Sequence, residues 1–276
     1  MRTVRVSRID QPLPAISQGT WNMGNHRRDR DVESAALRLG IELGMTLIDT
    51  AEMYASGGAE EVVAAAIAGQ REKVFVESKV LPGNASRQGT IKACEASLKR
   101  LGIETLDLYL LHWPGAFPLQ DTIAAFEQLV QAGKIRCWGV SNFDTAAMEE
   151  VERIAPGRCA CNQVLYNLAS RGVEWDLIAW CEQRGVLLQA YSPLAEGALP
   201  WKKLEPVAEP PQLTAAQVAL AWCTRDKGVQ AIPKSANPQR VRENAAAADV
   251  TLTSQVLAEL DALFPPPKGP TPLDTA

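Results

Sequence analysis

Three residues that can take part in acid–base chemistry follow apolar stretches of the chain. Asp49 follows the mainly apolar stretch 45–48, Lys79 comes soon after the apolar run 74–76, and His112 follows the run 106–111. An acid, a lysine and a histidine can hold and move protons, and Tyr54 lies just beyond Asp49. Each of these residues could instead cap a loop or pack in a core. A functional role is favoured because the same pattern occurs three times.

The spacing of these residues is typical of strand–helix units. Asp49 and Lys79 are 30 positions apart, Lys79 and His112 are 33 apart, and each interval holds one helix-length segment. Such spacing predicts a parallel sheet whose strand ends share one rim. Counted along the chain, strands are expected to end near Thr20, Asp49, Lys79, His112, Ser141, Gln163, Tyr191 and Ile232. Eight such units predict an α/β fold, a (β/α)8 TIM barrel with functional residues at that rim.

The other patterns predict the elements around the barrel. Alternating apolar residues on either side of residues 10–12 predict an N-terminal hairpin plug. Helices are expected over residues 31–43, 59–68, 90–100, 122–132 and 238–248, and from a capping box at Thr214 to Gln217. We expect Asp31 to cap the helix over residues 31–43. Its inner face should consist of Val32, Ala35, Ala36, Leu39 and Leu43. A C-terminal extra helix, capped by Thr253 with Val256, Leu257, Leu260 and Leu263 inward, precedes an extended tail over 265–276.

Composition narrows the class of protein. The chain has 276 residues, 46% hydrophobic and 22% charged, with a net charge of −4, which fits one globular domain over residues 1–276. No basic block suggests nucleic acid or an anionic membrane, and no apolar run suggests a signal peptide or a spanning helix, so we expect a cytoplasmic protein. With two histidines, six scattered cysteines and Cys159 only two positions from Cys161, we expect reduced thiols and no metal site.

Three separated motifs make the chain resemble the aldo-keto reductase family over nearly its whole length. They are Asp49-Thr-Ala-Glu-Met-Tyr54, the segment from Ser97 to Pro114 that contains Leu-Leu-His112-Trp-Pro, and the segment from Ile232 to Asn244. Residues 41–63 and the short turn after His112 are most similar to small bacterial methylglyoxal and aldehyde reductases. Ala55 departs from the glycine that many members carry after the tyrosine, so we expect a different shape for the loop that follows Tyr54.

The resemblance implies a carbonyl reductase in which Tyr54 donates the proton and Asp49, Lys79 and His112 complete a catalytic tetrad. A free tyrosine has a pKa near 10. A cation about 4 Å away is worth roughly 4 kcal/mol, or about three pKa units, at an effective dielectric near 20. We therefore expect Lys79 to lower the pKa of Tyr54, by less than this because Asp49 cancels part of its field. His112 would orient the substrate oxygen.

The resemblance also implies NADPH as the cofactor. Ser141, Asn142 and Gln163 would bind the nicotinamide carboxamide and Tyr191 would stack beneath the ring. Lys234, Ser235 and Arg240 would hold the 2′-phosphate at a helix N-terminus, with Glu243 and Asn244 near the adenine. The remaining expected cofactor contacts are Gly19, Thr20, Asp49, Ser192, Pro193, Leu194 and Ile232.

The expected substrate walls are Trp21, Met53, Tyr54, His112 and Trp113, with Trp201 as a weaker candidate. The loop after His112 is short, which predicts an open pocket for small aldehydes and dicarbonyls. Alternatives are a keto-sugar-acid reductase of the diketo-gluconate type, a regulatory subunit like the potassium-channel beta subunits, and a phosphate-binding barrel isomerase. The expected partner is a small carbonyl compound, with no nucleic acid or membrane, and the expected state is a monomer.

Overall fold

Eight parallel strands form the centre of the protein. The computed structural model describes residues 1–25, 29–208 and 212–275. The strands follow one another in the sheet in chain order, from β3 to β10. Their bounds are β3 Gln18–Gly19, β4 Leu47–Asp49, β5 Phe75–Val80, β6 Leu106–Leu111, β7 Ile135–Ser141, β8 Cys159–Leu165, β9 Leu187–Tyr191 and β10 Val229–Ala231. All eight end within two residues of the predicted positions.

The sheet closes between its first and last strands. Ile16 forms a parallel bridge to Ala231, and the Ser17 N–H donates to Ala231 O at 2.8 Å. The Gly19 N–H donates to Pro233 O at 3.1 Å, and a Cβ at Gly19 would lie only 2.8 Å from Ile232 O. Gly19 is therefore required for close contact at the seam, and the predicted (β/α)8 barrel is confirmed.

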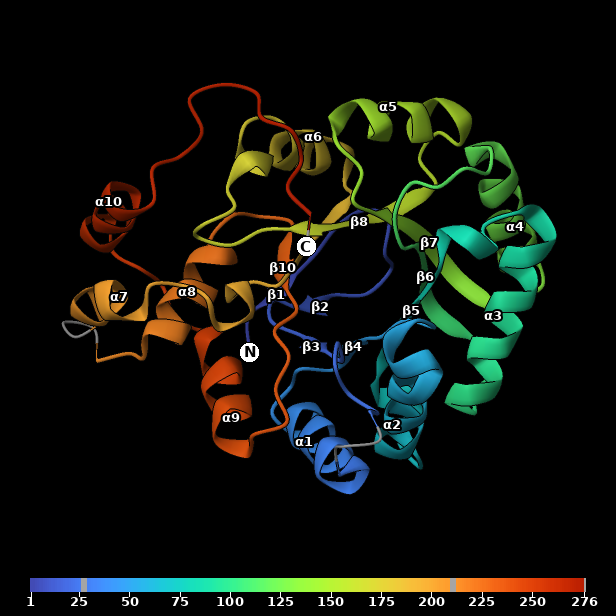
Figure 1. The fold of residues 1–276 in the computed structure, drawn as a ribbon, viewed down its shortest axis with the longest axis horizontal. Coiled ribbons are helices and arrows are strands. Elements are labelled where there is room, and N and C mark those ends of the chain that lie inside the picture. Colours follow the sequence, from blue (N-terminus) through green and yellow to red (C-terminus); the bar gives the residue numbers. More distant parts are fainter. Residues whose placement is uncertain (26–28, 209–211, 276) are drawn as a thin grey trace.

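Helices surround the strands (Figure 1). They are α1 Arg30–Glu42, α2 Gly58–Ile67, α3 Arg87–Leu101, α4 Leu119–Gln131, α5 Thr145–Ile154, α6 Leu177–Arg184, α7 Trp201–Ala208, α8 Ala215–Cys223, α9 Pro238–Ala247 and α10 Ser254–Leu263. The capping box at Thr214 and the cap at Thr253 are confirmed. α10 contacts α7 at the edge of the molecule (Figure 1). None of the described helices is both long and apolar enough to cross a membrane.

The prediction for the first helix is wrong in two respects. α1 is capped by Asp29, whose carboxylate accepts from the N–H groups of Asp31 and Val32. Val32 is 50% exposed and Ala35 is also exposed, and the buried face consists of Glu33, Ser34, Ala36, Leu37, Gly40 and Ile41. Polar residues lie on this face because Glu33 accepts the Gly24 N–H at 2.8 Å, a partner that helical periodicity does not reveal. Leu263 of α10, also expected inward, is 39% exposed.

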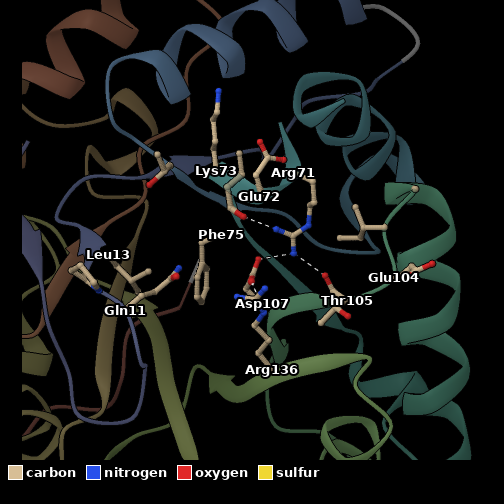
Figure 2. A pocket seen from close by; sticks show the side chains of 15 residues that line it. Gln11, Leu13, Arg71, Glu72, Lys73, Phe75, Glu104, Thr105, Asp107 and Arg136 are labelled. Atoms are coloured by element: carbon tan, nitrogen blue, oxygen red, sulfur yellow. Dashed lines mark hydrogen bonds and ion pairs between the residues drawn. The ribbon is translucent and has the colours of Figure 1, made fainter. Parts of the chain in front are cut away.

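The opposite end of the barrel is covered by the predicted hairpin, in which β1 Thr3–Val4 pairs antiparallel with β2 Leu13–Pro14. A hollow of about 770 Å³ lies at this end. Figure 2 shows Asp107 between Arg71 and Arg136 in its wall, with ion-pair distances of 2.7 and 3.2 Å. The Asp107 carboxylate also accepts the Val76 N–H at 2.7 Å. The charged groups in this wall are thus paired with one another, so we assign this end of the barrel a structural role.

Candidate active site

The four residues of the predicted tetrad lie together at the carboxyl ends of their strands. Lys79, with a fully buried side chain, forms an ion pair with Asp49 and donates to Thr50 O at 2.9 Å. The same Nζ donates to the Tyr54 hydroxyl at 3.3 Å. The rings of Tyr54 and His112 are 5.6 Å apart in an edge-to-face arrangement. A buried cation thus contacts a phenol that lies beside an imidazole.

The segment after Tyr54 is held in an unusual backbone conformation. Tyr54 begins the 3₁₀ turn η1 Tyr54–Gly57, in which Ala55 and Ser56 have φ of 49° and 53°. L-residues disfavour this left-handed region by about 1–2 kcal/mol each. Arg100 packs against Gly57 and pairs with Glu60 of α2. Alanine at position 55 therefore adds backbone strain, but the Tyr54 hydroxyl still contacts the Lys79 ammonium.

Burial controls the acidity of the site. It raises the pKa of Tyr54 to about 12, although the ammonium of Lys79 acts in the opposite direction. The expectation that Lys79 lowers this pKa overall is therefore wrong: removal from water outweighs the attraction. Burial and the charge of Lys79 lower the pKa of His112 to about 2. Burial alone would lower the pKa of Lys79, but Asp49, Tyr54 and Glu77 together raise it. Tyr54 thus stays protonated, and His112 neutral, at physiological pH.

A polar layer that the sequence analysis missed lies directly below the tetrad. Glu77 of β5 is fully buried and accepts from Gln163 Nε2 at 2.8 Å and from Gln189 Nε2 at 2.7 Å. Gln189 also donates to Gln230 Oε1 at 2.9 Å. The strand period could have indicated Glu77, because residues two apart on a strand face the same side. A glutamate in the middle of an apolar strand was the available signal.

The residues expected to bind nicotinamide lie on neighbouring strands. Gln163 Nε2 has three acceptors, Glu77, Asp49 at 2.9 Å and Gln189 at 3.1 Å, while no described group donates to its Oε1. The Tyr191 hydroxyl donates to Asn142 Oδ1 at 2.9 Å, and Asn142 Nδ2 donates to His112 O at 3.2 Å and to Ser141 Oγ. Asn142 therefore connects Tyr191 to the end of β6. The orientation of Gln163 leaves an acceptor suited to a carboxamide N–H.

The residues expected near the adenosine end lie in and after the loop that follows β10. Asn237 caps α9 by accepting from the N–H groups of Gln239 and Arg240. Lys234 and Ser235 are half-buried before this cap, and Arg240 is exposed in the first turn of the helix. Two cations beside a helix N-terminus suit a phosphate group. Glu243 is half-buried and accepts from Gln239 at 3.0 Å, while Asn244 is buried.

The remaining expected contacts are placed around these groups. The Thr20 hydroxyl donates to Asp49 O at 2.9 Å, and Asn167 Nδ2 donates to Ser192 O at 3.0 Å in the loop that continues through Pro193 and Leu194. Ile232 is buried at the barrel seam.

Aromatic side chains line the exposed side of Tyr54. The Trp21 ring lies 5.0 Å from the Tyr54 ring, and the Trp113 ring lies 4.8 Å from that of His112. Both indoles are about two-fifths exposed, at 43% and 38%. Met53 is half-buried beside Tyr54 in sequence. Trp201 begins α7 and donates to Gly197 O at 2.8 Å, so its described contact is structural.

Comparison with known proteins agrees with this geometry. The family model described as "Aldo/keto reductase family" matches residues 15–264. "Methylglyoxal reductase YeaE" of Escherichia coli is 54% identical, with 96% of each chain covered. "Glyoxal reductase" of Bacillus subtilis is 37% identical, over 94% of this chain and 92% of the relative. A crystal structure of an aldo/keto reductase from Klebsiella pneumoniae in complex with NADP and acetate superposes with a TM-score of 0.96 at 50% identity, covering 99% of both chains. The chain belongs to the aldo/keto reductase family.

Proposed function

We propose that the protein reduces small aldehydes and dicarbonyls of the methylglyoxal type to alcohols, with NADPH as the hydride donor. The observation that carries this proposal is the contact of the buried Lys79 ammonium with the Tyr54 hydroxyl at 3.3 Å, beside His112. The similarity to a methylglyoxal reductase and to an NADP-bound structure supports the substrate class and the cofactor.

Each member of the tetrad has a separate task. NADPH, when bound, supplies a hydride to the carbonyl carbon. Tyr54 donates its hydroxyl proton to the carbonyl oxygen, and Lys79 stabilises the phenolate that this leaves. Asp49 holds the Lys79 ammonium in place. His112, which is neutral, donates a hydrogen bond from its imidazole to the same oxygen and turns it toward Tyr54.

The residues described above fit the two ends of NADPH. Gln163 would offer an acceptor to the carboxamide, Ser141 and Asn142 at the end of the neighbouring strand β7 would bind the same group, and Tyr191 would stack beneath the ring. Lys234, Ser235 and Arg240 supply charge and a hydroxyl for the 2′-phosphate at the N-terminus of α9. This set favours NADPH over NADH.

The pocket supports small substrates. Trp21 and Trp113 remain partly exposed on either side of Tyr54 and His112, and only residues 113–118 separate His112 from α4. A short loop leaves the site open, which favours broad acceptance of small carbonyl compounds. The prediction of one monomeric, cytoplasmic barrel domain over residues 1–276 stays a prediction.

The decisive assay follows NADPH absorbance with methylglyoxal, an aromatic aldehyde and a keto-sugar acid, with NADH in parallel. We expect turnover with the first two and a preference for NADPH. Faster turnover of the keto-sugar acid would replace the aldehyde assignment. Tight NADPH binding without turnover of any of the three would favour a regulatory subunit, and failure to bind NADPH would favour a barrel isomerase.

A further inference from the structure

Two carboxyl groups face each other below the catalytic lysine. Asp49 of β4 and Glu77 of β5 are partners in the parallel register, and both are buried, at 3% and 0% exposure. One nitrogen, Gln163 Nε2, lies 2.9 Å from Asp49 and 2.8 Å from Glu77. The two acids therefore share one small polar space.

The charges around this space do not balance if both acids are ionised. Lys79, two residues from Glu77 on the same strand, is the cation in contact with Asp49. The other groups bonded to Glu77 are the uncharged amides of Gln163 and Gln189. The strands β4, β5, β6 and β9 also contribute Leu47, Phe75, Leu108 and Leu187 to a buried hydrophobic cluster, and Leu108 pairs in register with Glu77. Two buried carboxylates with one ammonium would leave a net negative charge in an apolar interior, which is strongly unfavourable.

Among the described residues, no cation other than Lys79 forms an ion pair with Asp49 or Glu77. The titratable groups that interact electrostatically with Glu77 come from several strands. They are Asp49 from β4, Lys79 from β5, Cys137 from β7, Cys161 from β8 and, above them, Tyr54. β6 contributes the apolar Leu108, while β9 and β10 contribute the amides Gln189 and Gln230. A shared proton is then the simplest way to remove the excess charge, as in other close carboxyl pairs.

Asp49 and Glu77 are not equivalent as holders of that proton. Asp49 contacts the Lys79 ammonium directly, whereas Glu77 contacts amide N–H groups. We propose that Glu77 is a protonated acid at neutral pH that hydrogen-bonds to Asp49, keeps Asp49 turned toward Lys79, and is a positioning residue for the tetrad. Burial and then the charge of Asp49 raise the pKa of Glu77 well above its ordinary value, in agreement with the geometry.

This arrangement predicts that Glu77 can replace Asp49 as the partner of Lys79. When Asp49 is changed to Asn, Lys79 loses its carboxylate and the neighbouring Glu77 loses the negative charge that favours its protonation. Glu77 should then ionise and compensate the ammonium. When both acids are changed, Lys79 has no carboxylate in this layer.

The test combines infrared spectroscopy with kinetics on the full-length protein. The wild type at pH 7 should show the carbonyl stretch of a buried protonated carboxylic acid, which E77Q and D49N should both lose. D107N is the matched control, because Asp107 is equally buried but paired with two arginines; its difference spectrum should show carboxylate bands. In NADPH assays, E77Q should lower kcat/KM about threefold in the wild type and about thirtyfold in the D49N background.

Each outcome decides the proposal. The absence of a protonated-acid band from the wild type would overturn it, and this measurement requires no variant to fold. Retention of the band in E77Q would assign the proton to another residue, and equal effects of E77Q in both backgrounds would overturn the coupling to Lys79. The role in turnover rests on the proposed function, but the spectra do not. If the band behaves as expected in a protein that reduces no carbonyl compound, only the proposed function fails.

Discussion

Removing the Lys79 ammonium tests the electrostatic basis of the site. At 3.3 Å from the Tyr54 oxygen and an effective dielectric near 20, a positive charge stabilises a phenolate by about 5 kcal/mol. Asp49 contacts the same ammonium and offsets part of this effect. If about half of this stabilisation remains, K79M should raise the activation free energy of proton transfer by roughly 2.5 kcal/mol and lower kcat roughly 70-fold.

K79M also breaks a buried ion pair, which should cost about 3–5 kcal/mol of folding free energy. We would measure urea unfolding first and then single-turnover reduction of methylglyoxal at a temperature where the variant is folded. K134M is the control, because the Lys134–Glu95 pair is 36% and 48% exposed and should contribute at most about 1 kcal/mol. Folded K79M with turnover within about threefold of the wild type would refute the assigned role of Lys79.

Four further predictions concern single residues of the site. Y54F should keep the fold and NADPH affinity but lose turnover by at least about 10²-fold; near-normal turnover would exclude Tyr54 as the proton donor. R240A should weaken NADPH at least about tenfold more than NADH, measured by fluorescence titration; equal losses would contradict the 2′-phosphate assignment. A55G should raise the free energy of unfolding by up to about 1 kcal/mol, because the backbone of Ala55 is in the left-handed region, which glycine adopts without strain. The same change at exposed Ala65 within α2 should destabilise by about 1 kcal/mol, and a loss at both sites would contradict the strain. His112, whose pKa is lowered to about 2, should destabilise the fold as pH falls below about 6.5, because only the unfolded chain gains the proton; by pH 4.5 the effect reaches about 3 kcal/mol. H112Q should remove this part of the acid sensitivity in unfolding curves, and an unchanged pH dependence would argue against a neutral buried imidazole.

The sequence by itself determined where the strands end and which residues stand there. Apolar runs followed by Asp49, Lys79 and His112 are local signals, and parallel strands in chain order must bring their carboxyl ends to one rim. The caps at Thr214 and Thr253 were equally local, because a cap depends on residues within one turn of the helix. These predictions needed no knowledge of what lay across the barrel.

The tertiary structure decided everything that depended on partners distant in the chain. The buried face of α1 differs from the predicted one because Glu33 accepts a hydrogen bond from Gly24, outside the helix. The pKa of Tyr54 is raised and not lowered as expected, because burial, a property of the whole barrel, outweighs the charge of Lys79. The role of Glu77 depends on its neighbours Asp49, Gln163 and Gln189, which come from other strands of the barrel. Local patterns fix element boundaries, whereas desolvation and charge balance depend on every group that surrounds an atom in the folded chain.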